Sequence, residues 1–210
     1  MTLTQAPARL RLTALAVLLL AVTFLQACAG RQVWATDAEI QAARHVHGGA
    51  AELTLVTIMN YTSGRGDHTA LFINADERVL FDPAGSWRLD EVPERNDVHF
   101  GMSANKGASF YMTHTRATHY TVVQRLRVTP EVAAQAKALA LAAGPVPPAR
   151  CALSTSGILR QLPGFESIRS GWYPHNLMAD FDRLPGVQRY ELHHDAPDIL
   201  QKVYQVQRPL

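Results

Sequence analysis

The stretch "GDHTALFINADERVLFDPAG", from Gly66 to Gly85, decides the fold and frames its chemistry. Two apolar runs flank the polar segment Ala75–Glu77, and this pattern predicts an antiparallel hairpin. His68 opens the first run and Asp82 ends the second. Because strand side chains alternate between faces, a three-residue turn places these two on one face, opposite or nearly opposite each other. A two-residue turn would place them on opposite faces.

Such a pair has a chemical use. A carboxylate bound to one ring nitrogen of a histidine fixes the ring's tautomer and stabilises the imidazolium that forms during catalysis. His68 and Asp82 would then be the base and the orienting group of a catalytic triad that lacks only its nucleophile. On the hairpin alone, ordinary structural roles are favoured, because Asp-Pro-Ala-Gly is common turn chemistry.

Cys151 is the candidate nucleophile. It follows the rigid segment "GPVPPAR" and opens "CALSTSGILRQL", which predicts a helix that ends before Pro163. Amides in a first helical turn face such a sulfur, lower the thiol pKa and can stabilise an oxyanion. Cys151, Thr155, Ile158 or Leu159, and Leu162 share one helical face, which we expect to pack on the sheet. The alternative is that Cys151 is simply the first core residue of this helix.

The remaining patterns predict an α+β fold, an antiparallel sheet with packed helices. One helix should begin after the N-cap Thr129 and end at Gly144. A long polar connection is expected over 83–107 and a short helix within 171–187. Further strands are predicted by "ELTLVTIMNY" (52–61), "ASFYMTH" (108–114) and "HYTVVQRLRVT" (119–129), and more weakly by "YELHHDA" (190–196) and "KVYQVQ" (202–207).

Composition limits the function classes. The 210 residues, 47% of them hydrophobic, suffice for one globular core. The net charge is only +2, and there is no basic block, so nucleic acid is not an expected partner. Nine histidines are scattered, and the pairs His45/His47 and His193/His194 lack a third ligand at a recognisable spacing. We therefore expect no metal and no organic cofactor.

The N-terminus has the organisation of a secretory signal. Arg9 and Arg11 precede the apolar run "TALAVLLLAVTF", which is short for a membrane span, and Leu25–Cys28 ("LQAC") resembles a bacterial lipobox. This resemblance implies cleavage before Cys28, acylation of its thiol and attachment to a membrane facing the periplasm, with the outer membrane favoured. An ordinary secretory signal with an incidental Cys28, free to form a disulfide with Cys151, is the alternative.

The expected organisation is a signal peptide over 1–27, a lipidated tether and N-terminal segment over 28–52, and a single α+β domain over 53–210. Within that domain the chain order is His68, Asp82 and then Cys151. This order resembles the circularly permuted branch of the papain-like hydrolases, which includes relatives of the NlpC-type cell-wall peptidases and of the lecithin–retinol acyltransferases. The resemblance covers roughly residues 53–165. Ala149-Arg150 replaces the aromatic or polar residue usual ahead of the cysteine.

The resemblance implies a permuted papain-like fold and a thiol hydrolase or acyltransferase that acts on an amide or ester. Cys151 would be the nucleophile, His68 the base and Asp82 its orienting partner. For a periplasmic lipoprotein, a cell-wall peptide is the first expected substrate and a lipid acyl ester the second. The competing hypothesis is a non-catalytic envelope lipoprotein that uses the same fold for binding or assembly.

Overall fold

The computed structural model describes residue 30 and residues 32–210. The expected signal peptide and Cys28 lie outside these residues. The described chain is an α+β structure around one seven-stranded sheet, in the order β4-β5-β3-β2-β1-β6-β7. Every neighbouring pair is antiparallel, so the predicted fold class is confirmed at this level. No helix in the described part of the chain is long and apolar enough to cross a membrane.

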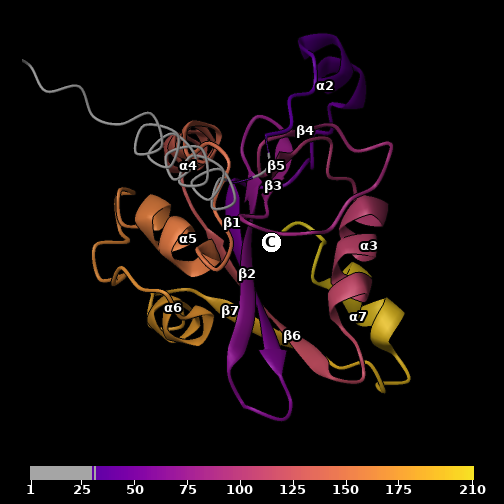
Figure 1. The fold of residues 1–210 in the computed structure, drawn as a ribbon, viewed down its shortest axis with the longest axis vertical. Helices are drawn as coiled ribbons and strands as arrows, with labels where there is room; N and C mark the ends of the chain where they lie inside the picture. The colour runs from indigo at the N-terminus through magenta and orange to yellow at the C-terminus, as the bar shows by residue number, and fades with distance from the viewer. Residues whose placement is uncertain (1–29, 31) are drawn as a thin grey trace, which may run out of the picture.

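The helices cover both faces of the sheet, with α4, α5 and α6 on one side and α3 and α7 on the other (Figure 1). The strands are β1 (Glu52–Asn60), β2 (Gly66–Asn74), β3 (Arg78–Phe81), β4 (Glu94–Arg95), β5 (Val98–His99), β6 (His119–Arg127) and β7 (Gln188–Leu192). The helices are α2 (Asp37–Ala43), α3 (Ala104–His114), α4 (Pro130–Ala142), α5 (Cys151–Leu159), α6 (Pro174–Phe181) and α7 (Ile199–Gln205).

Alternate residues of β2 contribute to two separate hydrophobic cores. Leu71 and Ile73 pack in the core that contains Ile158 and Leu159 of α5. Phe72 points the other way, where its ring meets Phe110 edge-on at 5.6 Å between centroids. Burial on both faces explains why the central strands are almost continuously apolar, and each fully buried Leu, Ile or Phe contributes roughly 1.5–3 kcal/mol.

The hairpin has the three-residue turn that the sequence allows. Asn74 pairs with Arg78 across residues 75–77, and the ladder continues to Leu71 opposite Phe81. Lys137 of α4 holds the turn, because its Nζ donates to the side chains of Asp76 and Glu77. Continuing the register by one residue places Asp82 across from Ala70. Asp82 and His68 therefore share a face, as the odd-length turn predicted.

Two predicted strands are helices. Residues 108–114 belong to α3, whose N-cap Ser103 and first turn lie in the segment expected to be a polar connection. The buried positions Gly107, Ala108, Phe110 and Tyr111 follow helical rather than alternating spacing. Residues 202–205 belong to α7, and Val203 and the C-cap residue Val206 are buried one turn apart. In both cases the aromatic and β-branched residues favour a strand locally, but the spacing of the buried positions requires a helix.

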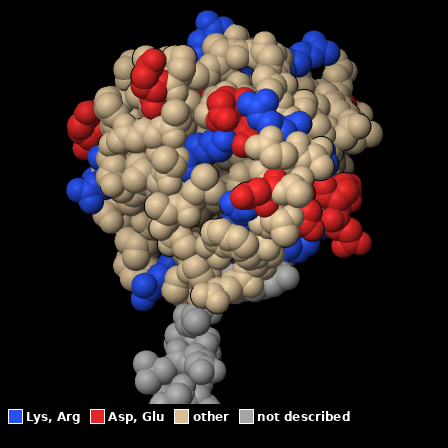
Figure 2. Space-filling view, turned by 90° about the horizontal axis from the view of Figure 1, so that it is seen from above, with Lys and Arg blue, Asp and Glu red and all other residues tan. Residues whose placement is uncertain are grey.

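Other predictions for the flanking segments hold in part. Thr129 caps α4 by accepting a hydrogen bond from the Val132 amide, and Gly144 after the helix has a left-handed φ of 68°. The 83–107 connection contains β4 and β5 and the first residues of α3. The late strand β7 ends at Leu192, so only the beginning of the 190–196 signal is extended. Acidic and basic side chains are interspersed on the face seen in Figure 2.

Candidate active site

His68 and Asp82 form a short ion pair. The distance between His68 Nε2 and Asp82 Oδ1 is 2.6 Å, and 18% of the histidine side chain but none of the aspartate side chain is exposed. Burial opposes a charged ring, yet the charge and hydrogen bond of Asp82 prevail and raise the pKa of His68 to about 10. Despite its own burial, the pKa of Asp82 is lowered by His68. The pair is therefore an imidazolium and a carboxylate near neutral pH.

The turn that follows β3 holds the carboxylate in place. The Asp82 amide donates to the Asp97 carbonyl at 2.8 Å, and the Gly85 amide donates to the Asp82 carbonyl at 3.0 Å. A Cβ atom on Gly85 would lie only 1.9 Å from Asp82 Oδ2. Any other residue at position 85 would displace the carboxylate. The glycine of "DPAG" is thus required by the aspartate as well as by the turn.

Cys151 occupies the expected position as the first residue of α5, and it is 6% exposed. Its predicted helical face is buried throughout, at Thr155, Ile158, Leu159 and Leu162. Burial raises the thiol pKa, but hydrogen bonding to His68 and the charge of its ring outweigh this, and the pKa of Cys151 is lowered. With Asp82 on Nε2, Nδ1 is the ring nitrogen left for the sulfur. The three predicted residues are therefore brought together, with the pKa of the thiol lowered and the pKa of the histidine raised by their contact.

The early end of β3 makes room for this contact. The β2–β3 ladder covers only Leu71 to Asn74. Thr69 therefore has a strand partner on the β1 side but none on the β3 side. The Thr69 amide interacts with the Cys151 sulfur, as does the Ala152 amide of α5, and both lower the thiol pKa. These amides form a small anion-stabilising site around the sulfur. The sequence does not predict this role of Thr69 directly. Its one indication is that "RVLF" is shorter than "HTALFIN", so the first residues of β2 have no partner in β3.

Backbone strain is concentrated next to the triad. Among the described residues, three non-glycine residues have a left-handed φ, and two of them are Ala84 at 57° and Ala149 at 64°. Each is two residues from a triad member, Asp82 and Cys151 respectively. Such conformations cost on the order of 1–3 kcal/mol and gather at functional sites, where surrounding structure enforces them. These two left-handed residues set the direction of the chain next to Asp82 and Cys151, and so orient the carboxylate and the thiol.

A cavity of about 200 Å³ opens beside the histidine, on the side of the sheet that carries α3. Its walls include His68, Gly85, His114 of α3, and Arg116, which follows α3. The His114 ring stacks on that of His68 with 6.0 Å between centroids, and burial lowers the pKa of His114. His114 was not predicted as a site residue because residues 108–114 were interpreted as a strand.

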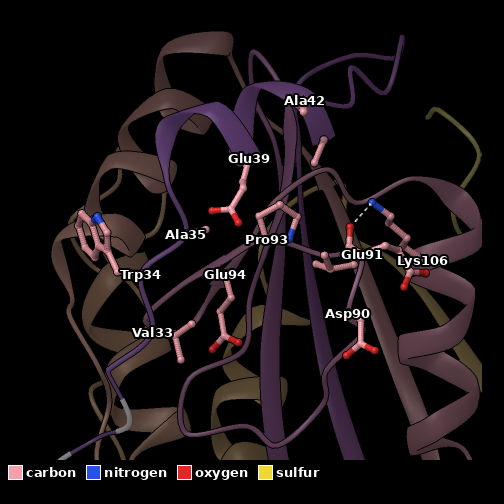
Figure 3. Close-up of a pocket in the computed structure, with 12 residues that line it drawn as sticks. Val33, Trp34, Ala35, Glu39, Ala42, Asp90, Glu91, Pro93, Glu94 and Lys106 are labelled. Atoms are coloured by element: carbon pink, nitrogen blue, oxygen red, sulfur yellow. Dashed lines mark hydrogen bonds between the residues drawn. The ribbon is translucent and has the colours of Figure 1, made fainter.

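A larger cavity of about 650 Å³ lies elsewhere, between α2 and the segment that leads into β4 (Figure 3). Trp34, Glu39 and Glu91 line it, and Lys106 Nζ donates to the Glu91 carbonyl at 3.2 Å. None of the triad residues lines this cavity, so the chemistry is better placed at the smaller one. No group of three or more His, Cys, Asp or Glu residues within the described ranges is arranged to hold a metal ion.

Comparison with known proteins identifies no relative: no family model, no curated protein and no solved structure matches this chain.

Proposed function

We propose that this protein is a cysteine hydrolase or acyltransferase of the permuted papain-like kind, which acts on an amide or ester through Cys151, His68 and Asp82. The observation that carries the proposal is the arrangement of these three side chains. Asp82 binds one nitrogen of His68, and the thiol of Cys151 interacts with the same ring, with a lowered pKa. Adjacent thiol and imidazole groups, with the imidazole oriented by a third group, are the signature of an activated nucleophile.

The catalytic cycle follows from the charges. The Cys151 thiolate attacks the substrate carbonyl carbon and forms a C–S bond, while the carbonyl oxygen becomes an oxyanion near the amides of Thr69 and Ala152. The His68 imidazolium donates its proton to the leaving nitrogen or oxygen, whose bond to carbon then breaks. Neutral His68 next takes a proton from water, or from an acceptor alcohol or amine. That nucleophile attacks the thioester, the product acid or new ester or amide departs, and the thiolate and imidazolium are restored.

The cellular setting of the proposal comes from the N-terminal sequence. Acylation of Cys28 would anchor the chain to a membrane facing the periplasm, with the outer membrane favoured. A cell-wall peptide is the substrate that such a location supplies first, and a lipid acyl ester is the second. Metabolic labelling with a palmitate analogue tests the anchor. Label should enter the wild-type chain and not Cys28→Ala, whereas equal labelling of both would refute lipidation at this residue.

The activity is tested with p-nitrophenyl esters and cell-wall peptides as substrates and with intact-mass detection of the acyl-enzyme. We expect a covalent adduct on Cys151 in the wild type and none in Cys151→Ala. His68→Ala should reduce turnover about 10³-fold or more, because triad members act as a unit. Turnover that survives in Cys151→Ala would rule out the proposed mechanism and favour the non-catalytic alternative.

A further inference from the structure

The cavity beside His68 contains a cation that the triad does not use. Arg116 is exposed and lies in its wall, and among the described residues none forms a hydrogen bond or ion pair with its guanidinium. The charge of Arg116 acts within this cavity, because it is one of the charges that lower the pKa of His114, another wall residue. An unpaired guanidinium in a concave site is suited to a planar anion, because its parallel N–H groups match the two oxygens of a carboxylate.

The other two charged groups of the wall are already engaged, because the His68 imidazolium binds Asp82 and Asp67 has partners of its own. Asp67 Oδ2 accepts from Asn60 Nδ2 at 3.0 Å and lies 2.9 Å from His119 Nε2. These contacts lower the pKa of Asp67, with the His119 hydrogen bond as the largest cause, so Asp67 is ionised and has partners. The negative charge of the cavity, on Asp67, is therefore already bound by Asn60 and His119. The guanidinium of Arg116 remains available to bind a ligand.

We infer that this cavity binds the carboxylate of the substrate's leaving group through Arg116, so that the preferred substrate is a peptide cleaved before a C-terminal amino acid. The inference rests on the proposed function. His68 lines the cavity and Cys151 does not. The leaving atom receives its proton from Nδ1, beside the sulfur, because Nε2 is bound to Asp82. A residue attached to that atom would extend past the edge of the imidazole into the cavity. A volume of about 200 Å³ suits one small residue.

Binding tests this inference without requiring catalysis. The probes are N-acetylglycylglycine and its C-terminal amide, titrated against the full-length chain carrying Cys151→Ala, with ligand-observed NMR as the readout. We expect the acid to bind about tenfold or more tightly than the amide, since a charge-assisted bidentate contact is roughly twice as strong as a neutral one. Adding Arg116→Gln should remove the preference. Equal affinity for the two probes, no binding of the acid, or a preference retained without Arg116 would overturn the inference.

Arg127→Gln is the matched control. Arg127 is exposed and lies opposite Glu52 in the β1–β6 register, at the other end of β1 from Asn60. This substitution removes the same charge from an exposed position far from the cavity, so it should leave the preference for the acid unchanged. Loss of the preference in Arg127→Gln as well would show that net charge, rather than a site at Arg116, attracts the probe.

A kinetic comparison separates this inference from the proposed function. Iodoacetate and iodoacetamide alkylate the same sulfur, but only iodoacetate carries a carboxylate. Arg116→Gln should lower the iodoacetate rate several-fold relative to the iodoacetamide rate, and an unchanged ratio would count against Arg116. If neither reagent reacts with Cys151 faster than with a free thiol, the proposed function fails. The binding experiment on the Cys151→Ala chain still decides the carboxylate site.

Discussion

His68 and Cys151 reach each other from opposite faces of the same sheet. His68 shares its face with Phe72 and stacks on His114 of α3, whereas Cys151 begins α5, which packs on the face of Leu71 and Ile73. They meet at the edge of β2, where the β3 ladder has ended. Because the two side chains depend on different cores, the site exists only when both layers of helices are in place.

The carboxylate of Asp82 should control the reactivity of the thiol. In Asp82→Asn the His68 ring loses the charge that raises its pKa, so less imidazolium is available to stabilise the thiolate. We expect the alkylation rate of Cys151 at neutral pH to fall about tenfold or more, and turnover to fall by about 10²–10⁴. Both are measured with purified chains.

Asp76→Asn is the control for that experiment. It makes the same change in the turn at the other end of the hairpin, where Asp76 pairs with Lys137 and is largely exposed. Its effect on stability should be below about 1 kcal/mol, and its effect on the thiol negligible. Equal reactivity of Asp82→Asn and wild type would remove Asp82 from the triad.

Gly85 should be intolerant of even one added methyl group. In Gly85→Ala the new Cβ would collide with the Asp82 carboxylate, so both thiol reactivity and stability should fall. Gly157→Ala is the matched substitution, made within the helix that carries Cys151, where an added Cβ meets nothing within 4 Å. It should raise the unfolding free energy by roughly 0.5–1 kcal/mol. Denaturant titration measures the stability of both variants, and alkylation of Cys151 measures their thiol reactivity. A Gly85→Ala chain as reactive as the wild type would contradict the packing described.

The ion pair should make stability depend on pH in a specific direction. The pKa of His68 is raised to about 10 in the folded state, above its unfolded value of about 6.5. Its contribution is therefore present in full below pH 6.5 and is lost as the pH rises through about 10. The lowered pKa of Asp82 gives a contribution that is lost as the pH falls into the acid range. Both contributions are complete between about pH 4 and 6.5.

This dependence is best measured in a Cys151→Ala background, which removes the titration of the thiol and also the smaller part of the His68 pKa rise that the thiol causes, while the larger part due to Asp82 remains. Between pH 6.5 and 10 the unfolding free energy should fall by on the order of 2–4 kcal/mol. Adding His68→Gln should flatten the profile over that range. A decline of equal size in the double variant would assign the pH dependence to other groups.

The sequence predicts the site correctly where a short local segment determines the position of a side chain. The three residues 75–77 determined that His68 and Asp82 share a face, and the rigid "PVPPAR" segment placed Cys151 at the start of a helix. Features of the site that depend on packing between segments far apart in the sequence could not be predicted. The Thr69 amide is available only because β3 stops at Phe81.

The two mistaken strands, in α3 and α7, contain residues whose intrinsic preference is overruled by the helical spacing of their buried positions. This error also concealed part of the site. His114 lies at the end of α3 and meets His68 only because residues 104–114 are helical. Arg116, two residues later, lines the same cavity.

The most direct test is the rate at which iodoacetamide alkylates Cys151 between pH 4 and 11, in the wild type and in His68→Ala. The wild-type rate should rise below the free-thiol pKa of about 8.5 and change again near pH 10 as His68 loses its proton. In His68→Ala the rise should move to the free-thiol range or above, because the buried sulfur loses its cation. A single rise at or above pH 8.5 in both proteins would contradict the thiolate–imidazolium pair, and with it the assignment of Cys151 as a nucleophile.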